Sequence, residues 1–129
     1  MNKIINNDFI EGMKSTAIKE VINDHLKSSY ELARSRAAIF LGLKLNESYA
    51  KYAHILLQEM NEEIHFENVR LGVKSAWTIA VVLAENLNKK DYQKLKEELD
   101  KWEEEEKQGL ISWLKDFPDQ IKILTEGRL

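Results

Sequence analysis

The sequence contains no cysteine, one proline and five glycines in 129 residues. Without cysteine, the chain forms no disulfide, offers no thiolate to a metal and has no cysteine nucleophile. This absence is typical of a reducing compartment, and we expect a cytoplasmic protein. Because proline and glycine are the residues that most often interrupt helices, their scarcity favours helix over most of the chain.

Strong net charge and long apolar runs are also absent. Lys and Arg number 19 against 22 Asp and Glu, and a net charge of -3 gives no field that attracts a phosphate backbone. Nucleic acid is therefore not an expected partner. The longest apolar run, residues 77–84, is far shorter than the roughly 20 residues that cross a bilayer. Residues 1–9 also lack the apolar stretch of a signal peptide, so we expect no membrane segment.

What the chain has in abundance is helical periodicity. Apolar residues recur at helical spacing almost throughout, and no alternating strand pattern appears. Glycine or asparagine at 42–46, near 72 and at 86–88 predicts breaks. The expected helices span 9–43, 47–74, 76–87 and 90–116.

These helices predict the fold class and the domain organisation. A chain of this length folds around one core, so we expect one domain over 1–129. The core is expected at 9–116 and a peripheral tail at 117–129. The fold class is all-α, and the predicted architecture is an antiparallel four-helix bundle.

The second expected helix carries two apolar stripes. Its main stripe is complemented by a narrower one, which consists of Ile55, Phe66, Val69 and Val73. A monomeric bundle would leave the narrower stripe uncovered, so we expect a homodimer.

Glu106 is the most anomalous residue, because it falls near the middle of the apolar face of the last expected helix. A buried carboxylate is costly unless it is paired, protonated or bound to a metal. The candidate partners are His25 and Arg36, which lie inside the apolar stripe of the first expected helix. A structural ion pair and a functional site are equal alternatives here.

Glu62 and His65 form a Glu-x-x-His pattern, in which both side chains can bind one metal or bridge two when the segment is helical. Taken alone, the pattern is more often a solvated helix face. A hairpin turn near residues 44 and 45 would bring His25 level with both side chains. The helical wheel, however, puts Glu62 on the narrower stripe. Either that stripe faces the interior or the pattern holds no metal.

Three segments resemble the helical hairpins of rubrerythrins and ferritins. They read YELARSRAAIF at 30–40, MNEEIHFENV at 60–69 and EEEEKQGLISWL at 103–114. The resemblance implies a ferritin-like up-down bundle with iron or another transition metal, and redox or peroxide-linked chemistry. The family builds its site from one Glu on each of two helices and a Glu-x-x-His on each of the other two.

Only part of that ligand set matches. Glu62 and His65 match the first Glu-x-x-His, and Glu106 matches the Glu of the second, whereas Gly109 stands where its His belongs.

The two single Glu ligands of the family are also poorly matched. On the first helix the family Glu falls at Tyr30 or, in another register, at His25, and on the third helix Glu85 is available. The resemblance therefore implies a site with Glu62, His65, Glu106 and His25 that is reduced to one metal, completed across a dimer, or lost.

A second family offers a metal-free alternative. The segments HLKSSYELARSRAAIF and YAKYAHILLQEMNEE are similar to the first two helices of HEPN domains. Their nuclease signature, an Arg followed four to six residues later by His, is missing. This resemblance implies a non-catalytic interaction module with a protein partner. Serine, cysteine and phosphate-loop chemistries are not indicated, because no Gly-rich loop is present and no His has a nucleophile context.

Overall fold

The computed structural model describes residues 1–6, 16–67 and 72–129. Within these ranges every regular element is a helix, which confirms the all-α class. The α-helices there are α1 Ile18–Glu20, continued by a π-helical turn Val21–His25, α2 Glu31–Leu43, α3 Tyr49–Glu59, α4 Ser75–Asn86, α5 Tyr92–Leu99, α6 Glu104–Trp113 and α7 Pro118–Glu126.

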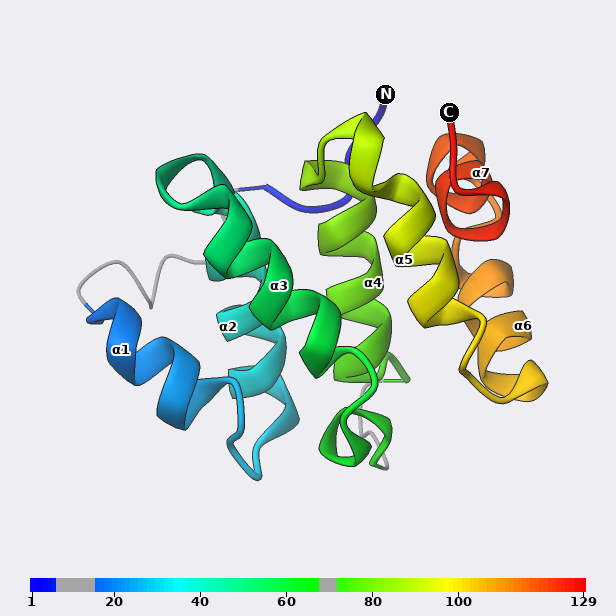
Figure 1. Ribbon diagram of the computed structural model, residues 1–129. Coiled ribbons are helices and arrows are strands. Elements are labelled where there is room, and N and C mark those ends of the chain that lie inside the picture. The colour runs from blue at the N-terminus through cyan, green and yellow to red at the C-terminus, as the bar shows by residue number, and fades with distance from the viewer. Residues whose placement is uncertain (7–15, 68–71) are drawn as a thin grey trace.

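The helices form two layers (Figure 1). α1, α3 and α5 lie nearer the viewer and are inclined in the same way, whereas α2 and α4 lie behind them. α4 packs against α2, α3, α5 and α7, and α5 also packs against α7.

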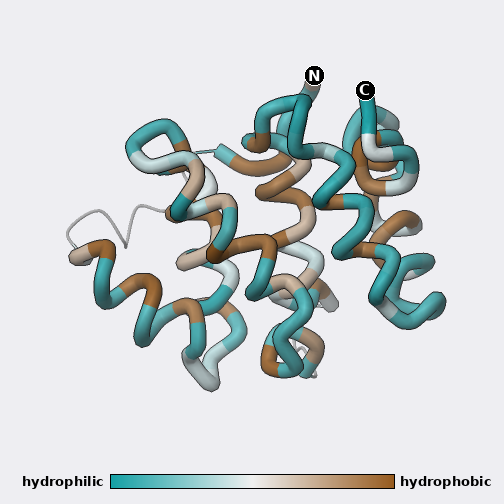
Figure 2. The backbone as a smooth tube through the Cα atoms, viewed as in Figure 1, coloured by the Kyte–Doolittle hydropathy of each residue, from teal (hydrophilic) through white to brown (hydrophobic). Residues whose placement is uncertain are grey.

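α4 is the central helix, as its composition predicts. Ten of its twelve residues are buried, and Figure 2 shows it mostly in the colours of apolar residues. A helix that is apolar on all sides must be covered on all sides. The expected span of 76–87 agrees with the observed helix to within one residue at each end.

α2 and α4 pack very closely against each other at Gly42. A Cβ atom at this position would lie 2.0 Å from Cγ1 of Val82, so no side chain larger than hydrogen fits without movement. This glycine lies in the last turn of α2, beside the helix end at Leu43 that the 42–46 stretch predicted, and it lets the two helices pack tightly.

The second expected helix ends earlier than predicted. α3 stops at Glu59, and Glu62 has an extended backbone conformation before the 3₁₀ turn Glu63–Phe66. The helical spacing assumed for the Glu-x-x-His pattern is therefore wrong. In the narrower stripe, Ile55 and Phe66 pack partly buried against the core. Val69 lies outside the described residues.

The last expected helix, 90–116, is two helices. α5 ends at Leu99, and Glu103 has an extended conformation before α6 begins. This turn changes the helical phase, so residues before and after it do not share one face as the helical wheel assumed. Neither glycine nor proline marks the turn, and Asp100 is the one residue in it of a type that favours turns, so the sequence signal there is weak.

The tail that was expected to be peripheral belongs to the core. Pro118 occupies the first turn of α7, where its missing N–H costs nothing. Ile123 and Leu124 of this helix have no exposed surface. The packing of α7 on α4 and α5 corrects the predicted limit of the core. No helix in the described part of the chain is both long and apolar enough to span a bilayer.

Candidate functional site

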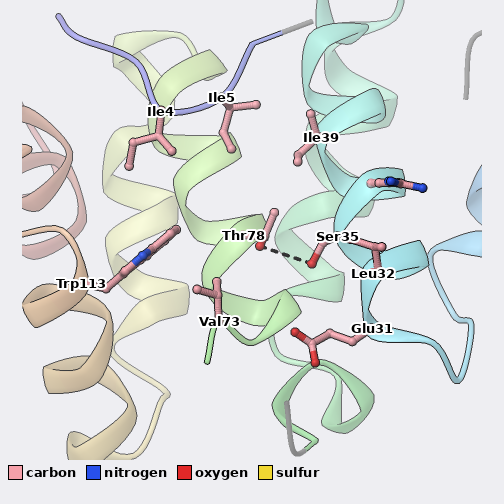
Figure 3. Close-up of a pocket in the computed structure, with 10 residues that line it drawn as sticks. Ile4, Ile5, Glu31, Leu32, Ser35, Ile39, Val73, Thr78 and Trp113 are labelled. Carbon is pink, nitrogen blue, oxygen red and sulfur yellow. Dashed lines mark hydrogen bonds between the residues drawn. The ribbon is translucent and has the colours of Figure 1, made fainter. Parts of the chain in front are cut away.

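A groove of about 420 Å³ lies between α2, α4, α6 and the segment that precedes α1 (Figure 3). Six of the ten residues that line it are apolar, namely Ile4, Ile5, Leu32, Ile39, Val73 and Trp113. In Figure 3 Trp113 lies on one side of the groove, while Leu32 and Ile39 project from α2 on the other. Its size falls within the roughly 300–1,000 Å³ of typical ligand pockets.

Helical spacing explains why α2 supplies so much of the lining. Residues 32, 35, 36 and 39 are three or four apart, and so share one face of the helix. At the floor of the groove the Ser35 hydroxyl donates to the Thr78 hydroxyl of α4 over 3.3 Å. The groove thus combines apolar walls with a small polar floor.

Two charged residues, Glu31 and Arg36, complete the lining. Burial raises the pKa of the Glu31 carboxyl, and the positive charge of Arg34 offsets part of that rise. Arg36 is exposed and has neither a hydrogen bond nor a salt bridge to any other described residue. Its guanidinium is therefore open to a ligand's acceptor groups.

A buried polar network lies beside the groove, between α2, α3 and α4. Glu59 binds Lys27 through one carboxylate oxygen and Nε2 of His65 through the other, at 2.8 Å. Nδ1 of His65 lies 2.8 Å from Oγ of Ser75. Arg34 donates from Nε to the same oxygen over 3.0 Å. Four of the five side chains are buried, and only Lys27 is exposed.

The network contains the order carboxylate, imidazole and hydroxyl that nucleophilic serine sites use. Ser75 and His65 have no exposed surface, however, and Arg34 already donates to the serine oxygen. A substrate carbonyl cannot approach an oxygen that is enclosed in this way. We therefore interpret the network as a structural link that joins the 3₁₀ turn to α2, α3 and α4.

Acidification is expected to weaken this network. Burial raises the pKa of Glu59, but the hydrogen bonds from His65 and Lys27 outweigh it, so the pKa lies below its ordinary value of 4.5. The carboxylate therefore stabilises the fold fully above that pH, and the contribution is lost as the pH falls through the lower, folded-state pKa. Urea unfolding should show a loss of stability below about pH 4.5 that is smaller in Glu59→Gln. Identical pH profiles for the two proteins would contradict this role.

The predicted metal ligands do not gather in one place. His65 faces Glu59 and Ser75, whereas Glu62 is exposed at the start of the 3₁₀ turn. His25 is half-buried at the end of the π-helical turn. In the ranges that the structure describes, no three His, Asp or Glu residues form a group that could hold a metal ion.

Glu106 has other partners than the sequence suggested. Its carboxylate binds the Lys74 ammonium and accepts a hydrogen bond from the Trp77 indole at 3.2 Å, in place of His25 or Arg36. The side chain keeps 21% of its surface exposed, so it is not a carboxylate stranded in the core. The turn before α6 changes the helical phase, so Glu106 does not lie on the apolar face that one continuous helix would have given it.

Trp77 also accounts for Gly109, the position at which the rubrerythrin resemblance calls for His. A Cβ atom at Gly109 would lie 2.8 Å from the Trp77 ring. The indole therefore occupies the space that a histidine side chain would need. Glu85, the only Glu of the third expected helix, instead accepts hydrogen bonds from the backbone of Ile4 and Ile5.

The sequence did not predict the buried network, because its residues are not three or four apart and so do not share a face of one helix. Glu59 and His65 are six residues apart and meet only because the chain turns after α3. Ser75 stands next to a predicted helix break, where a serine is ordinary. Arg34 is 1% exposed, and the only signal for its burial is its place among apolar neighbours on a predicted helix.

Comparison with protein-family models, curated proteins and solved structures finds no match to this chain.

Proposed function

We propose that this chain is a non-catalytic helical interaction module whose groove receives apolar side chains of a protein partner. The observation that carries the proposal is the largely apolar lining of the groove. Apolar surface that stays open to water in a folded chain favours association, because covering it releases hydrating water.

The exposed rim favours a protein over a small enclosed ligand. Among the described residues, four large apolar side chains are exposed, and two of them, Tyr30 and Leu32, lie at the start of α2. Leu32 lines the groove and is 51% exposed, and Tyr30 is 77% exposed. Tyrosine is enriched in protein interfaces, where its ring supplies apolar area and its hydroxyl a polar contact.

The polar groups of the groove fit the same proposal. Arg36 offers its guanidinium to a carboxylate at the edge of the partner. The Ser35 and Thr78 hydroxyls can bond to the partner's backbone, since each retains capacity beyond the bond between them. A partner segment with apolar side chains flanked by an acidic residue matches this lining.

Photocrosslinking in the cell tests the proposal. With benzoylphenylalanine in place of Leu32, we expect one discrete protein adduct, at a yield about fivefold above that from the exposed position Glu97 of α5. The added change Arg36→Glu should lower that yield. An adduct of twice the 15.1 kDa chain mass would identify the homodimer predicted from the sequence. Equal yields at positions 32 and 97 would refute the proposal.

The ferritin-like bundle with a metal site is the second hypothesis. It rests on the sequence pattern, and the contact of Glu59 with His65 favours it in one respect, because carboxylates often orient metal-binding histidines. It would require His65 to exchange Ser75 for a metal. Metal analysis of protein grown with iron and manganese decides between the hypotheses.

A further inference from the structure

Residues 2–5, the strap, are held against α4 and α7 through their backbone. The Glu85 carboxylate accepts the N–H groups of Ile4 and Ile5, at 2.9 and 3.0 Å. Nε2 of Gln120 donates to the Asn2 carbonyl and to Glu85, both over 2.7 Å. Glu85 and Gln120 are 5% and 1% exposed. Two buried side chains thus hold the strap by backbone groups that any sequence would offer.

The strap is also a wall of the groove. Figure 3 shows Ile4 and Ile5 above Thr78 and Trp113, on a segment that crosses α4. Ile5 is buried, and Ile4 is half-buried. If the strap left its place, the groove would lose two of its six apolar lining residues. Glu85 would then keep Gln120 as its only hydrogen-bond donor within the described part of the chain.

We propose that docking of the strap on Glu85 and Gln120 is coupled to occupation of the groove, so that the groove binds tightly only while the strap is docked. The inference rests on the groove being the binding site proposed above. A ligand that contacts Ile4 and Ile5 binds the docked state better, and it must stabilise that state in proportion. Loosening the strap should therefore weaken binding, and binding should tighten the strap.

Glu85→Gln loosens the strap in the full chain, and the new side chain has nearly the shape of the old one. Whichever way the new amide is oriented, its NH₂ group faces a donor that the carboxylate accepted. We expect the Ile4 and Ile5 amides to exchange with solvent about tenfold faster, as measured by NMR. The matched control is Glu126→Gln on α7, because that carboxylate pairs only with exposed Arg128 among the described residues.

Binding is measured with 1-anilinonaphthalene-8-sulfonate, an apolar anionic probe, on the same purified proteins. We expect its affinity to fall about fivefold in Glu85→Gln and to stay unchanged in Glu126→Gln. Saturating probe should slow exchange of the Ile4 and Ile5 amides in the wild type by about the same fivefold factor. If Glu85→Gln fails to fold, Gln120→Met removes the donor to the Asn2 carbonyl at a position outside the groove lining, and it leaves the Ile4 and Ile5 amides in place for the measurement.

Three results would overturn the coupling. They are wild-type Ile4 and Ile5 amides that exchange as fast as exposed ones, no binding of the probe to the wild type, and unchanged probe affinity in a variant with faster exchange. Failure of the proposed function has a different signature. Without a crosslink from position 32, but with probe binding coupled to the strap, the protein partner would be excluded and the coupling would stand.

Discussion

Replacing His65 by Ala is expected to lower the free energy of unfolding by about 3 kcal/mol. The imidazole has no exposed surface, so its removal leaves a cavity. Glu59 and Ser75 also lose the ring nitrogens that lie 2.8 Å from each. Urea unfolding, with an unchanged dependence on denaturant, measures the effect.

His54→Ala is the matched control, because His54 is exposed on α3 and makes no contact with the network. Its effect should stay within about 0.5 kcal/mol. A chelator should change neither protein if His65 is structural. If His65 binds a metal, the chelator should destabilise the wild type to the level of His65→Ala and leave the variant unaffected. Equal stability of the two variants would contradict both roles.

Gly42→Ala is expected to cost about 2 kcal/mol, although alanine is the better helix former. The intrinsic preference of a helix for alanine over glycine favours the change by roughly 1 kcal/mol. Against this, the new methyl group would lie 2.0 Å from Cγ1 of Val82, and valine has little freedom to rotate away. The α2–α4 contact must open, and overpacking of this kind typically costs about 1–3 kcal/mol or more.

Shortening Val82 tests whether this clash is the cause. Val82→Ala alone should destabilise the chain, because the side chain is fully buried. In the double variant the methyl group introduced at position 42 has room, so the two changes should cost at least about 1 kcal/mol less together than their sum. Strict additivity in a thermal or urea unfolding cycle would show that the loss at position 42 has another origin.

Periodicity predicted the elements that local sequence controls. α4 has nearly its expected span because its consecutive apolar residues favour a helix that is covered on all sides. The α2–α3 connection also falls at the predicted residues. In the candidate site, periodicity indicated which α2 residues share a face, but not that α6 and the strap complete a groove. No pattern within one helix reports on a neighbour that is distant in sequence.

By itself, the sequence determined that the described chain is helical, that α4 is central and that a helix ends before Pro118. The tertiary structure alone decided where the long predicted helices turn. After Glu59 and after Leu99 no glycine or proline interrupts the chain, and local preference for continuing the helix is worth only tenths of a kcal/mol per residue. The packing of α7 on α5 buries Leu124 and outweighs that preference at the second turn, because a fully buried leucine side chain contributes on the order of 2 kcal/mol. At the first turn, buried His65 contributes through its hydrogen bonds to Glu59 and Ser75.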